Sequence, residues 1–135
     1  MPRIDVAQRR ARLGQRHQLA SAAADPVGAA RAMVALHATD PASVFLSVAA
    51  RTAPVEIETI ERALYQDRTL LRMLGMRRTM FVVPVEIAPV IQAACANAIA
   101  EAQRRIYVNF LDEAGIGDDE WFRAVQDATE HALVK

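Results

Sequence analysis

Between residues 70 and 83 the apolar residues change from helical spacing to two short continuous runs, and this change constrains the fold most. Leu70–Leu74 ends at Gly75, and Met80–Val83 follows a turn that contains arginines. Two short apolar runs around a glycine-containing turn are typical of a β-hairpin. Pro84 then ends the second run. The sequence therefore predicts one small hairpin in the middle of the chain.

Helix start signals lie on both sides of this hairpin. Each is an aspartate followed by helical apolar spacing, and two of them are followed directly by proline, which suits the first helical position. They are Asp5 (with Gln8 in capping-box spacing), Asp25-Pro26, Asp40-Pro41 and Asp118. We expect a helix from each signal, and apolar periodicity predicts two more helices at residues 55–65 and about 86–113.

Three details of these helices can be tested directly. In the helix after Asp25, the apolar face of Val27, Ala30 and Val34 continues to His37. In the last helix, Trp121 and Phe122 are expected to be core anchors rather than platforms on which a base stacks. In the helix at 55–65, Ile57, Ile60 and Leu64 are expected to face inward.

The predicted fold class is mainly α: a winged helix-turn-helix with one small β-hairpin followed by long helices. Three short helices before a hairpin is the order of such a module. Residues 1–84 would form the winged-helix module. Residues 85–135 would form a helical extension that starts a second module, in a chain truncated after Lys135.

Composition excludes several classes of protein. The chain has 135 residues, enough for one domain or one small domain plus the start of another. No apolar run approaches the ~20 residues that span a bilayer, and no leader follows Met1, so we expect a cytoplasmic protein without a membrane partner. Cys95 is the single cysteine and the three histidines are dispersed. We therefore expect no disulfide, no metal site and no cofactor.

Charge is uneven although the net charge is zero. Five arginines lie within residues 3–16 against one acid, and four lie within residues 68–78 with none. This distribution predicts two basic surfaces on a neutral body. The helix at 55–65, which would enter the major groove in a regulator of this kind, carries three glutamates against one arginine. Its charge argues against reading DNA in that way.

The chain resembles a known family over roughly residues 5–130. The resemblance rests on AQRRARLGQRHQLA, ARAMVALHATDPAS and, most specifically, residues 64–84 within IERALYQDRTLLRMLGMRRTMFVVP. These segments are similar to the N-terminal part of the AlkZ/YcaQ-type proteins of bacteria. The resemblance implies tandem winged-helix modules that form a DNA-binding surface. It also implies a DNA glycosylase activity that releases alkylated bases and unhooks crosslinks.

The family's water-binding motif, Gln-x-Gln or Gln-x-Asp, falls at His37-Ala38-Thr39, with Asp40 next. Neither motif position is glutamine in this chain. The resemblance makes His37, Thr39 and Asp40 the candidate catalytic residues: His37 can act as a base or a donor, and Asp40 can stabilise an oxocarbenium-like sugar or activate water. The alternative is structural, with Asp40 as the cap of the next helix and His37 packed at a helix end.

The candidate DNA-binding residues lie in and beside the hairpin. They are Arg68, Arg72, Arg77, Arg78 and Thr79. They would contact phosphates as a wing does, or be solvated turn residues that pair with the acidic 56–61 face. A stripe of Arg9, Arg12 and Arg16 is a second candidate surface.

The sequence therefore favours a DNA-binding winged-helix protein that resembles glycosylases and binds duplex DNA weakly, without sequence preference. The alternative is a non-catalytic winged-helix protein of regulation or assembly, with self-association through residues 86–135.

Overall fold

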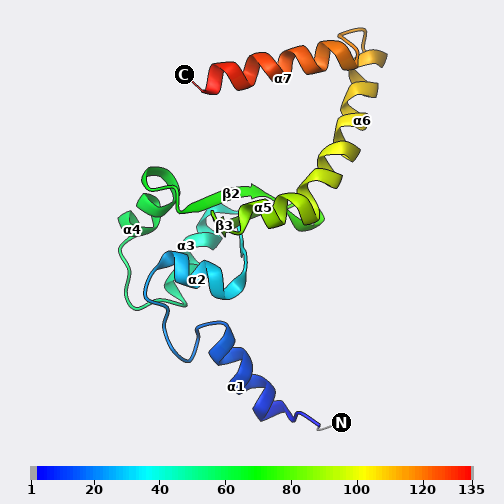
Figure 1. The fold of residues 1–135 in the computed structure, drawn as a ribbon. Helices are drawn as coiled ribbons and strands as arrows, with labels where there is room; N and C mark the ends of the chain where they lie inside the picture. The colour runs from blue at the N-terminus through cyan, green and yellow to red at the C-terminus, as the bar shows by residue number, and fades with distance from the viewer. Residues whose placement is uncertain (1–2, 135) are drawn as a thin grey trace. The chain divides into compact units, whose positions relative to one another are not determined.

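The computed structural model describes residues 3–134, and its chain divides into two compact units, Met1–Ala96 and Asn97–Lys135. Figure 1 shows the elements of each unit.

The first unit begins with three helices, each started by a predicted aspartate. In α1 (Val6–Arg16), Asp5 accepts from the Gln8 backbone N–H at 2.7 Å and the capping box is complete. In α2 (Pro26–Met33), Asp25 accepts from the Gly28 N–H. In α3 (Pro41–Ala49), Asp40 accepts from the Ala42 N–H. The three predicted helix starts are confirmed, because a side-chain oxygen satisfies an otherwise unpaired N–H at each one.

The helix predicted at 55–65 is present in a modified form. It begins as α4 (Ile57–Glu61) and continues as a π-helical turn, η1 (Arg62–Gln66). Ile60 is buried as expected, but the expectation for Ile57 is wrong, since it is 60% exposed.

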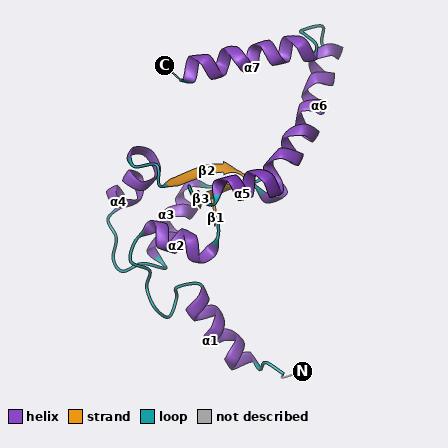
Figure 2. Cartoon of the chain, viewed as in Figure 1, coloured by secondary structure: helices purple, strands orange, loops and turns teal. Residues whose placement is uncertain are grey.

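The predicted hairpin is confirmed as β2 (Leu70–Leu74) and β3 (Met80–Pro84), joined by the turn η2 (Met76–Arg78). A third strand, β1 (Leu36–His37), pairs with β3, so the sheet has the antiparallel order β1-β3-β2. Figure 2 shows helices and strands in separate colours.

The prediction that His37 continues the face of α2 is wrong. Val34 has a φ of 69° and ends the helix at Met33, so that the next residues are free to enter the sheet. A β-branched residue in the left-handed region is a marked departure from ordinary backbone geometry. The chain reverses there, and His37 becomes part of β1.

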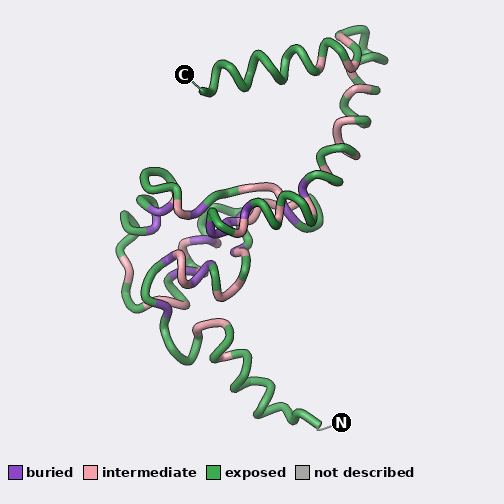
Figure 3. The backbone as a smooth tube through the Cα atoms, in the orientation of Figure 1, coloured by how far each residue is buried: buried purple, intermediate pink, exposed green. Residues whose placement is uncertain are grey.

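The core lies between α2, α3, the segment from α4 to η1, and one face of the sheet. Directly opposed residues of an antiparallel pair share a face, and Leu36, Val82 and Arg72 are opposed in this way. Leu36 and Val82 are buried on that face together with Leu70. Figure 3 shows the buried segments of the chain.

The expected helical stretch after the hairpin is present as α5 (Ala88–Ile91), η3 (Gln92–Ala96) and α6 (Asn97–Glu113). In the second unit, Asp118 starts α7 (Asp119–Leu133) as predicted. The core role expected for Trp121 is wrong, because 42% of it is exposed. Phe122 is partly buried and lies 5.4 Å from the Arg104 guanidinium. No helix of the described residues is long and apolar enough to cross a membrane.

Candidate functional site

The segment 37–40 leads from β1 into α3 and presents its polar side chains to solvent. The exposed His37 ring meets Phe81 edge-on, with 5.5 Å between the ring centres. Its Nε2 lies 3.4 Å from the Thr39 hydroxyl. Asp40 accepts from the Ala42 N–H at 3.0 Å and is therefore a helix cap. This contact is the structural role expected for Asp40; the catalytic roles of all three residues stay predictions.

Two other side chains fix the backbone of this segment. The Ser43 hydroxyl lies 2.8 Å from the His37 carbonyl oxygen and 2.6 Å from that of Asp40. Arg72 donates from Nε and from a terminal nitrogen to the Ala38 carbonyl, at 3.2 and 3.0 Å. Sequence reasoning missed Ser43. Its position three residues after a cap aspartate was the available signal, since such hydroxyls often bond to nearby carbonyls.

Arg72 thus joins the predicted DNA-binding set to the predicted catalytic segment, although Arg72 and His37 lie on opposite faces of the sheet. Arg72 is opposed to Val82 and lies on the core side of the sheet, whereas His37 is opposed to Phe81 on the other side. An arginine has five N–H donors. Two of those of Arg72 are directed at Ala38, which leaves three.

The hairpin turn carries two consecutive arginines in left-handed backbone. Arg77 and Arg78 have φ angles of 56° and 58°, and the Thr79 N–H donates to the Met76 carbonyl at 3.2 Å. Positive φ at both central positions defines a type I′ turn, in which Asn-Gly is the preferred pair. Arginine in this conformation costs about 1–2 kcal/mol per residue.

A groove of about 380 Å³ lies beside this turn. It is lined by His37, Met76, Arg77, Thr79 and Phe81. The groove therefore unites one predicted catalytic residue with two predicted DNA-binding residues. Arg68, Arg72 and Arg78 do not line it.

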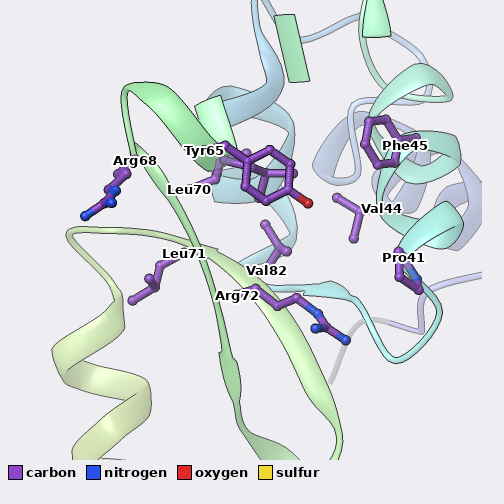
Figure 4. A pocket seen from close by; sticks show the side chains of 10 residues that line it. Pro41, Val44, Phe45, Tyr65, Arg68, Leu70, Leu71, Arg72 and Val82 are labelled. Carbon is purple, nitrogen blue, oxygen red and sulfur yellow. The ribbon is translucent and has the colours of Figure 1, made fainter. Parts of the chain in front are cut away.

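A second, smaller pocket of about 220 Å³ lies between α3, η1 and the sheet. Arg68 and Arg72 belong to its lining, which is otherwise almost entirely apolar. Figure 4 shows the Tyr65 ring over this pocket with its hydroxyl directed toward Val44, while Arg68 and Leu71 point away from the other labelled side chains.

The other candidate features remain apart from these two sites. Arg9 and Arg12 are exposed on α1, a helix without a buried residue. Cys95 is half-buried in η3 and lines neither site. Among the described residues no group of three or more histidine, cysteine or acidic side chains is arranged to hold a metal ion.

A family model described as DNA glycosylase AlkZ-like matches residues 30–135. No curated protein and no solved structure matches the chain. The matched range includes the 37–40 segment, the hairpin and both pockets, and it begins after α1. It covers well over half of the sequence. The chain therefore belongs to the AlkZ-like DNA glycosylase family.

Proposed function

We propose that this chain is a DNA-binding module of a glycosylase-like repair protein and that its hairpin contacts the phosphates of duplex DNA. Three short helices, α2, α3 and α4, precede the hairpin, and this order supports a winged helix-turn-helix over residues 1–84, with residues 85–135 starting a further module. The partner is duplex DNA in a bacterial cytoplasm, bound weakly and without sequence preference.

The observation that carries the proposal is the strained pair Arg77-Arg78 at the tip of the hairpin. Glycine or asparagine would adopt this turn with less strain, yet two exposed cations occupy it. Strain of this kind concentrates at binding sites, where the side chain is needed for what it contacts. The arginine side chains are well suited to phosphate oxygens. The hairpin is therefore the surface that faces DNA.

The acidic helix supports the same orientation. Glu56, Glu58 and Glu61 are exposed on and before α4. Carboxylates close to closely spaced phosphates would be repelled. The duplex accordingly approaches the hairpin rather than the surface of α4.

The proposed chemistry is hydrolysis of an N-glycosidic bond beside the groove. His37 Nε2 and the Thr39 hydroxyl, 3.4 Å apart, would each hydrogen-bond to the attacking water from its protein side. Asp40 would supply negative charge near the sugar while one of its oxygens caps α3. General acid–base groups of this kind contribute a factor of about 10²–10⁴ to a rate.

A second candidate is a non-catalytic DNA-binding protein of regulation or assembly, with self-association through residues 86–135. The engagement of Asp40 as a helix cap favours it. Release of free base from alkylated or crosslinked DNA separates the two candidates. Asp40→Asn keeps the cap but removes the charge, so activity that falls in Asp40→Asn and His37→Ala supports catalysis. Absence of release by the wild type, with DNA still bound, supports the second candidate.

The hairpin is tested with the double variant Arg77→Asn/Arg78→Gly. It places a relaxed pair in the turn, so unfolding should require about 1–2 kcal/mol more. It also removes two cations, so the log–log salt slope of duplex binding should flatten by up to about 1.8. A gain in stability together with a loss of affinity is a combination that general damage to the fold does not produce.

The matched control is Arg9→Gln/Arg12→Gln, which removes the same charge from α1. It should keep the wild-type salt slope. If this control loses the slope while the hairpin variant keeps it, the DNA surface lies on α1 and the proposal is wrong.

A further inference from the structure

The pocket between α3, η1 and β2 combines an apolar interior with a cationic rim. Pro41, Val44 and Phe45 come from α3, Leu64 and Tyr65 from η1, and Val82 from β3. Its ten lining residues, all within the described chain, include two arginines and no acid. Such a lining is complementary to an apolar group that carries negative charge nearby.

The size of the pocket limits the ligand further. At about 220 Å³ it is smaller than the roughly 300–1,000 Å³ of pockets that hold drug-sized molecules. It accommodates a single ring system. Tyr65 stands over it with 69% of its surface exposed, which leaves a face of the aromatic ring uncovered. A flat heterocycle can stack on such a face.

The local backbone holds Tyr65 in this position. The Asp67 N–H donates to the Arg62 carbonyl at 2.8 Å, the bond of a π-helical turn. Arg68 follows with a φ of 50°. Single π turns are frequent at functional sites, because the additional residue redirects the side chains that follow it.

Arg72 is positioned in advance by its two hydrogen bonds to Ala38, as described above. Its remaining N–H groups are available to acceptors on a ring edge. Because Ala38 lies between His37 and Thr39, the same guanidinium that lines the pocket also fixes the backbone of the 37–40 segment.

We propose that this pocket binds one unstacked base of a DNA strand, with the base stacked on Tyr65 and its edge accepting from Arg72. Arg68 at the rim faces the adjoining phosphate. This inference rests on the proposed DNA-binding function and assigns the pocket no chemical step. A base that is already unpaired enters most readily, because its extrusion requires the least energy.

The test compares a duplex that contains one bulged adenosine with the matched duplex, using the 135-residue chain. The wild type should bind the bulged duplex more tightly. Tyr65→Ala should weaken binding of the bulged duplex by a factor of about five or more, the lower limit for losing one stacked base. Its binding of the matched duplex should stay unchanged. Tyr65→Phe keeps the ring and should retain the preference. Tyr107→Ala removes an exposed tyrosine of α6, outside the pocket, and serves as the control.

Three outcomes overturn the inference in distinguishable ways. Equal wild-type binding of both duplexes rejects the pocket but leaves the hairpin proposal intact. Binding of neither duplex rejects the proposed function and the pocket's DNA ligand together. A preference that persists in Tyr65→Ala places the unpaired base elsewhere on the protein. Free deoxyadenosine monophosphate, added as competitor, identifies the source of the ring: if it binds through Tyr65 while bulged DNA does not, the ligand is a mononucleotide rather than a DNA strand.

Discussion

The packed body, residues 23–96, differs from the helices α1, α6 and α7 in how many of its side chains are buried. All fourteen buried hydrophobic residues of the described chain lie between Ala23 and Ala96. No residue of α1, α6 or α7 is buried. Both candidate pockets and the strained hairpin lie in the packed body. Side chains there can be held in fixed geometry, as recognition and catalysis both require.

The second unit depends on polar contacts instead. Arg104 pairs with Asp119 at 2.7 Å and lies over Phe122, and Arg123 pairs with the same aspartate at 2.6 Å. Partly exposed ion pairs contribute little and are screened by salt. The hydrophobic core therefore belongs to residues 23–96, while α6 and α7 leave large apolar side chains exposed.

The largest expected effect is a loss of stability of the packed body that leaves the second unit unchanged. Ile60→Ala removes a core side chain that is 2% exposed and should lower the free energy of unfolding by about 2–5 kcal/mol. Ile106→Ala makes the same change on α6, where the side chain is 45% exposed, and should have an effect within about 0.5 kcal/mol. Urea unfolding followed by residue-resolved amide exchange measures both.

Equal losses of unfolding free energy in Ile60→Ala and Ile106→Ala would contradict the inferred difference in packing between the body and α6. A large cost at Ile106 alone would show that α6 is packed against protein in solution, since an exposed side chain has little burial to lose.

Local sequence signals predicted the elements whose cause is local. Asp5, Asp25, Asp40 and Asp118 cap helices because the N–H groups that they accept from lie within three positions. The hairpin was likewise predictable, because its two strands are adjacent in sequence. Strand β1 was not, since two residues carry no periodicity and their partners, Phe81 and Val82, lie more than forty positions away.

The candidate site was only partly accessible for the same reason. His37, Thr39 and Asp40 were found through the family motif. The hydrogen bond from Arg72 to the Ala38 carbonyl was not, because it joins residues that are 34 positions apart. The pocket under Tyr65 depends on a π turn, and no residue of that turn signals it in the sequence. Arginines at positive φ also give no turn signal, because turn propensities favour glycine and asparagine.

Two glycine-to-alanine substitutions, one in the packed body and one in α1, should change stability by intermediate amounts and in opposite directions. A Cβ at Gly75 would lie 2.9 Å from the Phe81 ring, so Gly75→Ala must displace the aromatic ring that His37 contacts. We expect a loss of about 1–3 kcal/mol, as for overpacking of a core. At Gly14, inside α1, the added Cβ meets only Ala20 at an ordinary 3.6 Å. Gly14→Ala should stabilise α1 by about 0.5–1 kcal/mol.

Thermal unfolding measures the first change, and far-ultraviolet circular dichroism with amide exchange in α1 measures the second. The His37 ring signals in an NMR spectrum should shift in Gly75→Ala and stay unchanged in Gly14→Ala. An unshifted His37 in Gly75→Ala would mean that Phe81 does not hold the histidine.

The smallest effect concerns an ion pair that ties α2 to the residues after β3. Arg31 donates from Nε to Glu86 at 3.0 Å, and both side chains are about half exposed. The hydrogen bond from Arg31 holds the pKa of Glu86 below its ordinary value. The folded state therefore binds this proton less readily than the unfolded chain. The pair consequently contributes stability above the ordinary pKa of about 4.3, and this contribution is lost as the pH falls through the folded-state value.

Glu86→Gln should accordingly lower the melting temperature at about pH 7, by less than Gly75→Ala does, because solvent weakens exposed pairs. The difference from wild type should shrink toward about pH 3, where the carboxyl is increasingly protonated in the folded and the unfolded protein. Glu101→Gln, on α6, is the matched control and should change the melting temperature little at either pH, since no ion pair of Glu101 is found among the described residues. A Glu86→Gln deficit of the same size at both pH values would mean that the side chain stabilises the body by packing rather than by charge.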